Sequence, residues 1–418
     1  MELLNLRILV YEYYSGGGLE DNPFSPSILC EGIGMLRNLI SDFIAAGHSV
    51  ITILDSRLVN TNFLPIGIDK IIAISNLKEL QKIIENLSSS IDVAYVIAPE
   101  TNNILQKILK IIQRTEIVSL NCSISGINKV YNKSNLSKFL RKNKIKTPKS
   151  IDFKIFDRIS SIKDSINKNF CYPIIIKPSI GTNCEGMSIA QNEQEVKKAI
   201  LKIKKDTNSI DIIAQEFIRG THVSVNLLSS CDKAVAMSLN KQKISINNPD
   251  NISQYIGGIV PFESPLRDRA FEITEKLVES IKGLIGFIGI DLILTNKEIV
   301  IVDINPRITT SYIGLNKVIK NNLAKALINC FFEKKVPNKI KYNGYVYFFK
   351  IKNPNTMMNS FIFNNQIEEI QVPSLKTSGA KTVYSIISVK SRTKNSLYKK
   401  IEKIKRKLQI NATGGNNF

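Results

Sequence analysis

Apolar and polar positions follow two different rhythms along this chain. Over roughly the first 120 residues, short apolar runs alternate with segments whose apolar side chains recur every three or four positions. Such an alternation of strand and helix patterns predicts an α/β unit built on a doubly wound parallel sheet. We expect its strands at residues 6–13, 48–54, 68–74, 91–98 and 116–120, and its helices at 31–46, 77–87 and 103–113.

The loop after the first expected strand, residues 15–18, reads Ser-Gly-Gly-Gly. Loops at the carboxyl ends of parallel strands commonly contact ligands. The spacing is not GxGxxG, so we disfavour dinucleotide binding with Asp55 as the ribose acid. A ligand contact and a plain flexible turn remain equally good interpretations of this loop.

A second region begins near Asn128, where Lys133 stands at the start of an expected helix. The apolar strand expected at 172–179 carries Lys177 and leads into a loop with glycines at positions 181 and 186. Glycines let backbone N–H groups approach a phosphate closely, and a lysine adds a positive charge. The pattern favours a phosphate-binding loop, although an ordinary hairpin with a glycine turn looks the same.

Two later segments offer contacts to the rest of a nucleotide and to a substrate. The apolar strand expected at 210–218 ends in Gln-Glu-Phe-Ile, whose backbone can pair with an adenine edge. Glu216 or His222 could reach adenine or ribose, but a histidine on a strand is more often structural. Residues 253–258, with one tyrosine and two glycines, suggest a mobile loop over a substrate or a plain surface connection.

The most informative stretch is residues 286–315, which predicts two strands joined by a tight turn. Alternation in the first strand separates Asp291 from its apolar neighbours. In the second strand, a period of two puts Ile299, Ile301 and Asp303 on one face.

Asp303 and Asn305, two positions apart, should project together beside Asp291. Two carboxylates and an amide oxygen suit Mg²⁺, which takes few protein ligands and completes its shell with phosphates and water. Arg307 adds a rigid fork for a carboxylate or phosphate. The alternative is that the two acids are ordinary solvated strand residues.

Composition narrows these possibilities. The chain has 418 residues, 43% hydrophobic and 22% charged, as in a water-soluble globular protein. Six scattered cysteines and only two histidines disfavour disulfides and histidine-based metal sites, and indicate a reducing cytoplasm. The net charge of +21 attracts anions, but no RNA-binding motif accompanies it, and a codon bias toward lysine would produce the same excess.

The last part of the chain predicts strands at 344–350 and 382–389 and a basic amphipathic helix at 396–408. Such a helix can touch an anionic surface. We favour packing on the domain, with a solvated lysine face.

Taken in order, these motifs resemble the ATP-grasp superfamily. The resemblance runs from about residue 128 to residue 330 and rests on Lys133, YPIIIKP (172–178), the glycine-bracketed loop (181–186), QEFI (215–218), GID (289–291) and VDINPR (302–307). It implies α/β and α+β architecture in four parts. These are a pre-ATP-grasp α/β domain (1–127), a first lobe with the glycine-rich loop (128–214), a second lobe with the metal site (215–335) and a small α+β extension (336–418).

The resemblance also implies a role for each matching position. Lys177 and Arg307 would act in catalysis, and Asp291, Asp303 and Asn305 would bind the metal. The positions that would bind ATP are Lys133, Lys177, Gly181, Thr182, Gly186, Gln215, Glu216, Phe217, Ile218, His222 and Val302. We expect the substrate at Tyr255, Gly257, Gly258, Thr309, Thr310 and Ser311, with Tyr312 as an aromatic wall. Most relatives have Glu at the position of Asp303, and the shorter side chain bears on whether one or two metals bind.

The implied activity is that of an ADP-forming carbon–nitrogen ligase, which uses ATP and Mg²⁺, or Mn²⁺ in its place, to make an amide through an acyl phosphate. The motifs at 11–19, 54–57 and 303–315 look most like the tyramine–glutamate ligase group of methanofuran biosynthesis. The expected partners are a small carboxylate and a small amine. A homodimer is compatible with this reading, and neither nucleic acid nor membrane is expected.

Three alternatives stay open at this point. A biotin-carboxylase-type enzyme would make carboxyphosphate from bicarbonate with the same ATP site. A nucleotide-binding regulator would keep the fold without turnover. A basic nucleic-acid-binding protein would show salt-sensitive binding to oligonucleotides.

Overall fold

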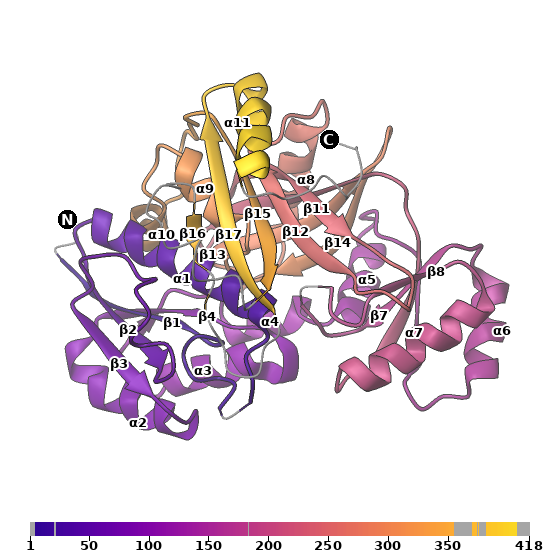
Figure 1. The fold of residues 1–418 in the computed structure, drawn as a ribbon, viewed down its shortest axis with the longest axis horizontal. Coiled ribbons are helices and arrows are strands. Elements are labelled where there is room, and N and C mark those ends of the chain that lie inside the picture. The colour runs from indigo at the N-terminus through magenta and orange to yellow at the C-terminus, as the bar shows by residue number, and fades with distance from the viewer. Residues whose placement is uncertain are drawn as a thin grey trace.

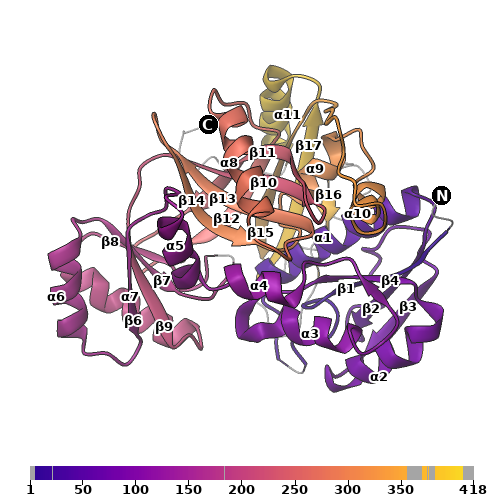
Figure 2. The same ribbon diagram turned by 180° about the vertical axis from the view of Figure 1, so that it is seen from behind.

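The structure is a computed structural model, and it describes residues 5–20, 22–182, 184–354, 370–373, 375 and 382–407. The strands of these residues form three sheets, which are flanked by helices (Figures 1 and 2). In the described part of the chain, no helix is long and apolar enough to cross a membrane.

The N-terminal unit is a five-stranded parallel sheet in the order β3-β2-β1-β4-β5, which confirms the doubly wound prediction. The apolar side chains of β1 alternate between two cores. Leu9 packs with α2 and α3 on one face, and Ile8 and Val10 pack with α1 on the other. The elements are β1 (Arg7–Glu12), α1 (Pro26–Ala45), β2 (Ser49–Asp55), β3 (Lys70–Ile74), α2 (Lys78–Leu87), η1 (Ser88–Ser90), β4 (Val93–Ile97), η2 (Thr101–Asn103), α3 (Ile104–Ile112), β5 (Val118–Ser119) and α4 (Ile124–Val130).

Helix α1 starts five residues before the predicted position, at Pro26. Proline fits the first turn of a helix because its missing N–H would have no partner there. The helix lies between the parallel sheet and the second lobe. Its Gly34 is so close to α9 that a Cβ there would lie 2.5 Å from Ile313 Cδ1.

The first lobe is a four-stranded antiparallel sheet in the order β6-β9-β7-β8. Two helices, α6 and α7, cover one face and close a core of Ile, Val and Ala side chains. Its elements are α5 (Lys133–Lys142), β6 (Ser150–Lys154), α6 (Ile159–Asn169), β7 (Ile174–Pro178), β8 (Ser188–Ala190), α7 (Glu193–Asp206) and β9 (Asp211–Glu216).

The second lobe is an eight-stranded sheet in the order β14-β13-β10-β11-β12-β15-β17-β16. The strands expected in a C-terminal extension are part of this same sheet, because β15 pairs with β12. Its elements are β10 (Thr221–Ser229), β11 (Ala234–Ser245), β12 (Gln254–Val260), α8 (Arg267–Glu279), β13 (Gly286–Leu294), β14 (Ile299–Asn305), α9 (Tyr312–Val318), α10 (Leu323–Phe332), β15 (Tyr345–Pro354), β16 (Ile370–Val372), β17 (Thr382–Ser391) and α11 (Lys394–Lys407).

The predicted hairpin is present as β13 and β14, but its second strand does not alternate as expected. The register shifts where Asp291 faces Asp303 and the next pair is Leu292 with Ile301, so one extra residue enters β14. Such a β-bulge reverses the sides to which later residues point. Ile301 therefore packs in the core, while Asp303 faces a cavity, and the expectation that they share a face is wrong.

The expectation of a loop at 253–258 is also wrong, because this segment forms most of β12, in the middle of the sheet. Gly257 and Gly258 pair with β11 on one side and with β15 on the other. A Cβ on Gly257 would lie 2.1 Å from the carbonyl oxygen of Phe348. Here the glycines allow close approach of strands and do not mark a flexible cover.

Replacing Gly257 with alanine should destabilise the fold by about 1–3 kcal/mol, since the added methyl group overlaps the backbone of β15. The measurement is the midpoint of urea unfolding followed by circular dichroism. Gly181→Ala is the control, because its Cβ would lie no closer than 3.7 Å to Pro178. Equal midpoints for the two variants would contradict the close packing of β12 on β15.

Candidate functional site

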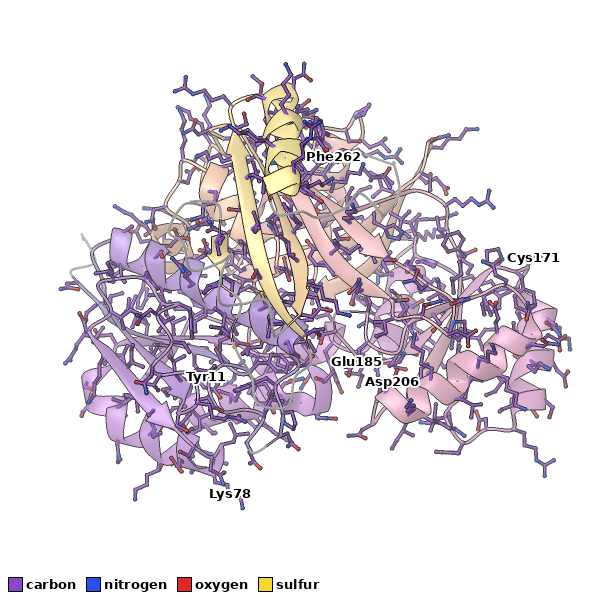
Figure 3. The ribbon with its side chains drawn as sticks, viewed as in Figure 1. Tyr11, Lys78, Cys171, Glu185, Asp206 and Phe262 are labelled. Carbon is purple, nitrogen blue, oxygen red and sulfur yellow. The ribbon has the colours of Figure 1, made fainter. Side chains whose placement is uncertain are left out.

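A large cavity lies where the N-terminal unit and the two lobes meet. Of the residues predicted for the site, all except Gly186, Gly257, Gly258 and Tyr312 line it. Glu185, which also lines it, sits near the middle of the molecule, between the N-terminal unit and the first lobe (Figure 3).

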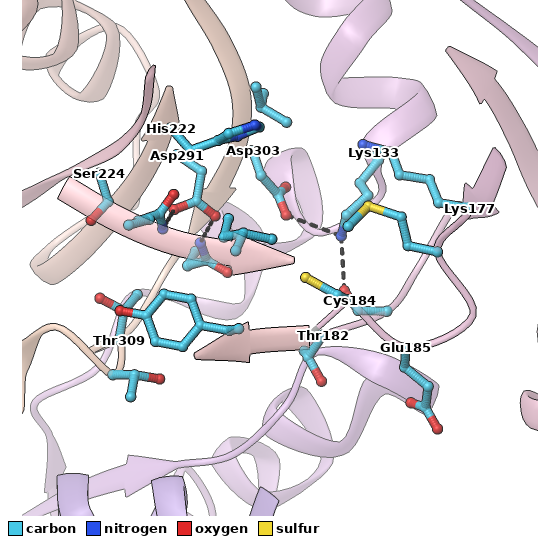
Figure 4. A pocket seen from close by; sticks show the side chains of 18 of the residues that line it. Lys133, Lys177, Thr182, Cys184, Glu185, His222, Ser224, Asp291, Asp303 and Thr309 are labelled. Carbon is cyan, nitrogen blue, oxygen red and sulfur yellow. Dashed lines mark hydrogen bonds and ion pairs between the residues drawn. The ribbon is translucent and has the colours of Figure 1, made fainter. Parts of the chain in front are cut away.

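Lys133 connects two walls of this cavity (Figure 4). It is the first residue of α5, which begins there because the side chain of Asn132 accepts a hydrogen bond from the Asn135 N–H. The Lys133 ammonium donates to the carbonyl oxygen of Gly181 at 2.9 Å and lies 3.0 Å from Asp303 Oδ2. One positive charge thus joins the glycine-rich loop to the β13–β14 hairpin.

Lys177 is a buried cation on β7, only 6% exposed. Strand alternation places Ile174 and Ile176 in the core of the first lobe and turns Lys177 to the cavity. Burial, and then the charge of Lys133, lower the pKa of Lys177 to about 8. Among the described residues its ammonium has no hydrogen bond or ion pair, so a bound anion would be favoured next to it.

Asp291 and Asp303 face each other across the hairpin. Asp291 accepts hydrogen bonds from Gln242 Nε2 at 2.8 Å and from Asn305 Nδ2 at 3.2 Å. Burial, and then the charge of Asp303, raise the pKa of Asp291 to about 6. With Asn305 Nδ2 turned to Asp291, the amide oxygen stays available as a ligand.

The donor set fits a hard cation. Two carboxylates and one amide oxygen form an all-oxygen cluster, which suits Mg²⁺ and leaves room for phosphate oxygens and water. The described residues hold no group of three or more His, Cys, Asp or Glu side chains that could bind a metal. The site therefore fits an ion held partly by its substrate.

An apolar slot forms the end of the cavity near β9. It is lined by side chains from both lobes, which are Pro148, Ile175, Phe217, Ile218, Leu292, Ile293 and Val302. Glu216 is anchored beside it, because its Oε1 accepts the N–H of Lys149 at 2.6 Å. His222 also lines the cavity, and burial lowers its pKa, which favours the neutral ring.

Arg307 is fixed by the N-terminal unit. Its Nε and Nη2 lie 3.0 and 3.2 Å from the two carboxylate oxygens of Glu100, which follows β4. Both side chains are largely buried. Sequence reasoning missed Glu100; its position just past the end of a parallel strand is the signal that could have found it.

The hydroxyl groups after β14 are held in place by hydrogen bonds. Thr309 and Ser311 both donate to Asn226 Oδ1, at 3.2 and 2.9 Å, and Thr310 donates to Glu31 Oε2 at 2.8 Å. Tyr312 is not an aromatic wall of the cavity. Its ring is buried, and its hydroxyl donates to Asp42 of α1.

Three glycines predicted for the site, Gly186, Gly257 and Gly258, do not line the cavity, and each is closely packed against another segment. Gly186 has a φ of +69°, and a Cβ on it would meet Thr207 at 3.1 Å, so it turns the chain against α7. Gly257 and Gly258 lie inside the sheet. In the loop after β1, Gly16 packs on the ring of Tyr11 in the same way.

Sequence reasoning also missed a wall of the cavity formed by the N-terminal unit and by β11. Glu12 and Tyr14 belong to the motif at 11–19, but no local pattern marks the others, because they reach the cavity only through the packing of distant segments. The set is Glu12, Tyr14, Ile28, Glu31, Gly32, Met35, Ile97, Ala98, Pro99, Gln242 and Ile244.

Comparison with known proteins agrees with this geometry. Residues 130–311 match the ATP-grasp domain, and residues 48–127 match the pre ATP-grasp 3 domain. The tyramine–L-glutamate ligase of Methanocaldococcus jannaschii is 30% identical over 336 residues, which cover 80% of this chain and 92% of that ligase. The chain belongs to the ATP-grasp family.

Solved ATP-grasp structures share the fold. An ATP-grasp superfamily protein from Archaeoglobus fulgidus has a TM-score of 0.61 at 20% identity and covers 92% of this chain and 100% of its own. The biotin carboxylase domain of the 2-oxoglutarate carboxylase from Hydrogenobacter thermophilus, solved with MgADP and bicarbonate, has a TM-score of 0.71 at 14% identity, covering 96% and 89%. The expected class, an ATP-grasp ligase, is confirmed.

The pKa of Lys177 predicts how nucleotide affinity changes with pH. The ammonium is charged below about pH 8 and neutral above it, so affinity for ADP should fall about tenfold between about pH 7 and pH 9.5. Isothermal titration calorimetry at several pH values measures this. In Lys177→Arg, whose guanidinium stays charged, the decrease should disappear. A decrease of the same size in both proteins would remove Lys177 from the phosphate site.

Proposed function

We propose that this ATP-grasp ligase joins a carboxylate to an amine, cleaving ATP to ADP and phosphate through an acyl-phosphate intermediate. The observation that carries the proposal is the convergence of Lys133, Lys177, Asp291, Asp303 and Arg307 in one cavity. They come from α5, β7, β13 and the segment 303–307, and together they offer an anion site, a cation site and a guanidinium held in place by Glu100. This set suits phosphoryl transfer, which depends mainly on positioning and charge stabilisation.

The two steps balance without a protein nucleophile. A substrate carboxylate oxygen attacks the γ-phosphorus, and the bond to ADP breaks, with ADP keeping the electron pair. The amine nitrogen then attacks the acyl carbon, and phosphate leaves with the electrons of the C–O bond. Lys177 and Arg307 would face the negative charge that develops on the transferred phosphoryl group.

Nucleotide and metal each have a matching wall. The apolar slot beside Phe217 and Ile218 would take adenine, and Lys133 and Lys177 would hold the phosphates. Asp291, Asp303 and Asn305 would hold Mg²⁺, or Mn²⁺ in its place, which when bound neutralises charge on the β- and γ-phosphates. The biotin carboxylase domain from Hydrogenobacter thermophilus, which shares the fold, was solved with MgADP.

For the substrates, we propose L-glutamate and an amine resembling tyramine. The support is the 30% identity to the tyramine–L-glutamate ligase, which extends over 92% of that enzyme. The likeness to biotin carboxylases, at 14% identity, concerns the fold alone.

We also propose the four-part division at 1–127, 128–214, 215–335 and 336–418, and action in the cytoplasm. All six cysteines are unpaired, which suits a reducing compartment.

The direct test is ADP release by the purified enzyme with Mg²⁺-ATP and L-glutamate, with and without tyramine and a panel of other amines. We expect ADP release that depends on the amine, and a product with the mass of the amide. Bicarbonate-dependent ADP release without an amine would instead identify a carboxylating enzyme. Nucleotide binding without turnover under any condition would identify a regulator.

Asp303→Ala should abolish turnover, by about 10³-fold or more, in a protein that still folds, because it removes a carboxylate from the metal site. The assay is amide formation across a Mg²⁺ titration, with circular dichroism to confirm folding. Asp152→Ala is a matched control, since it removes an exposed strand carboxylate that also pairs with a lysine, Lys138. A folded Asp303→Ala variant with normal turnover would refute the metal assignment.

A further inference from the structure

The cavity contains a buried carboxylate that the ATP and metal sites do not use. Glu12, the last residue of β1, is 1% exposed and lines the cavity from the side of the N-terminal unit. Its Oε2 accepts the Ser15 N–H at 2.7 Å and the Ser15 hydroxyl at 2.6 Å, and its Oε1 accepts the Tyr14 N–H at 3.1 Å. Because Oε1 has a single protein donor among the described residues, it keeps an acceptor position for a ligand.

The surrounding chain is shaped around this carboxylate. The Tyr11 hydroxyl donates to the carbonyl oxygen of Gly16 at 3.0 Å, which closes the loop that carries the Ser15 donors. On the other side, a Cβ at Gly32 of α1 would lie 2.6 Å from the carboxyl carbon of Glu12. These contacts around the Glu12 carboxylate account for the Tyr-Glu-Tyr-Tyr-Ser-Gly-Gly-Gly motif, which has no role in the nucleotide site.

Two other acids that line the cavity, Glu31 and Asp303, already have cationic partners. Lys350 Nζ lies 2.5 Å from Glu31 Oε1, and Lys133 pairs with Asp303. Arg307, whose charge lowers the pKa of Glu12, is bound to both carboxylate oxygens of Glu100. In the part of the chain that the structure describes, Glu12 has no ion pair of its own. A buried carboxylate without a cation is costly, so a cationic ligand would be favoured beside it.

The N-terminal unit lines this cavity mainly with apolar and aromatic side chains. They are Tyr14, Ile28, Met35, Ile97, Ala98 and Pro99. A ligand that fits both features carries a primary ammonium on an apolar or aromatic body. An inorganic cation would leave these walls without contacts.

We propose that Glu12 binds the ammonium group of the amine substrate and removes its first proton, in an acceptor subsite built by the N-terminal unit. This inference rests on the amide-forming function proposed above. The proton passes from the ammonium nitrogen to Oε1 of Glu12, which frees the lone pair for attack on the acyl carbon. The second nitrogen proton leaves with the phosphate, so that atoms and charge balance.

The acidity of Glu12 is suited to this role. Burial, opposed by the hydrogen bonds from Ser15 and Tyr14 and by the charge of Arg307, raises its pKa to about 7. A general base works best when its pKa is near the working pH. The other titratable groups that face it are the phenols of Tyr11, Tyr13 and Tyr14, which stay neutral because their pKa values are raised further. The kcat/KM for the amine should therefore rise as pH increases through about 7.

Glu12→Gln tests the inference, and hydroxylamine separates its two halves. Hydroxylamine is uncharged at neutral pH and traps acyl phosphates as hydroxamates without needing a base. With L-glutamate and ATP, the variant should form hydroxamate within about twofold of the wild-type rate, while its kcat/KM for tyramine falls about 100-fold or more. The rising limb of the pH profile should disappear in Glu12→Gln and persist in Glu12→Asp.

Asp42→Asn is the matched control, since it also removes a buried carboxylate, one whose partners are Tyr312 and Asn316 outside the cavity. It should lower thermal stability without changing the ratio of hydroxamate to tyramine activity. The inference is overturned if Glu12→Gln keeps its kcat/KM for tyramine, or if both activities fall equally. Wild-type enzyme that forms no hydroxamate with any carboxylate would instead defeat the amide-forming function, and this inference with it.

Discussion

The single extra residue in β14 is the constraint on which the cavity depends. Without the bulge, strict alternation would put Asp303 and Asn305 on the side of Ile299 and Ile301, inside the core. The bulge keeps both isoleucines buried and turns the two polar side chains to the cavity, opposite Asp291. The Lys133 ammonium then lies 3.0 Å from Asp303 Oδ2, and its hydrogen bond to the carbonyl oxygen of Gly181 ties the glycine-rich loop to the same ion pair.

Charged side chains of the same sign lie near one another in this cavity. Lys177 loses basicity through burial and through Lys133, and Asp291 loses acidity through burial and through Asp303. Like charges are therefore held together before any ligand arrives, which is unfavourable unless a ligand of the opposite sign separates them. Such preorganisation is typical of sites that stabilise developing charge.

Sequence patterns predicted the parallel sheet, the hairpin and most cavity residues because each depends on local periodicity or on a short motif. The prediction of a loop at 253–258 fails because its glycines allow the close approach of β11 and β15. Pairing with β15, which lies far along the chain, leaves no local signal in the sequence. The sequence also gives no sign of the bulge, because apolar and polar residues alternate in Val-Asp-Ile-Asn whether or not an extra residue is present. Glu12 and Glu31 could not be assigned to the site, because only the docking of the N-terminal unit brings them to the cavity.

Helix α1 has two tasks that cannot be separated. Its Gly34 and apolar face are pressed between the parallel sheet and the second lobe, while Glu31, Gly32 and Met35, on the same turns, form part of the cavity wall. Substitutions in this wall that would change the substrate are therefore limited by the packing of α1 between the domains. Outside this helix interface, the cavity is also lined by Ile244 and Ile246, from β11 and its continuation. Related enzymes with new acceptors would be expected to diverge there first.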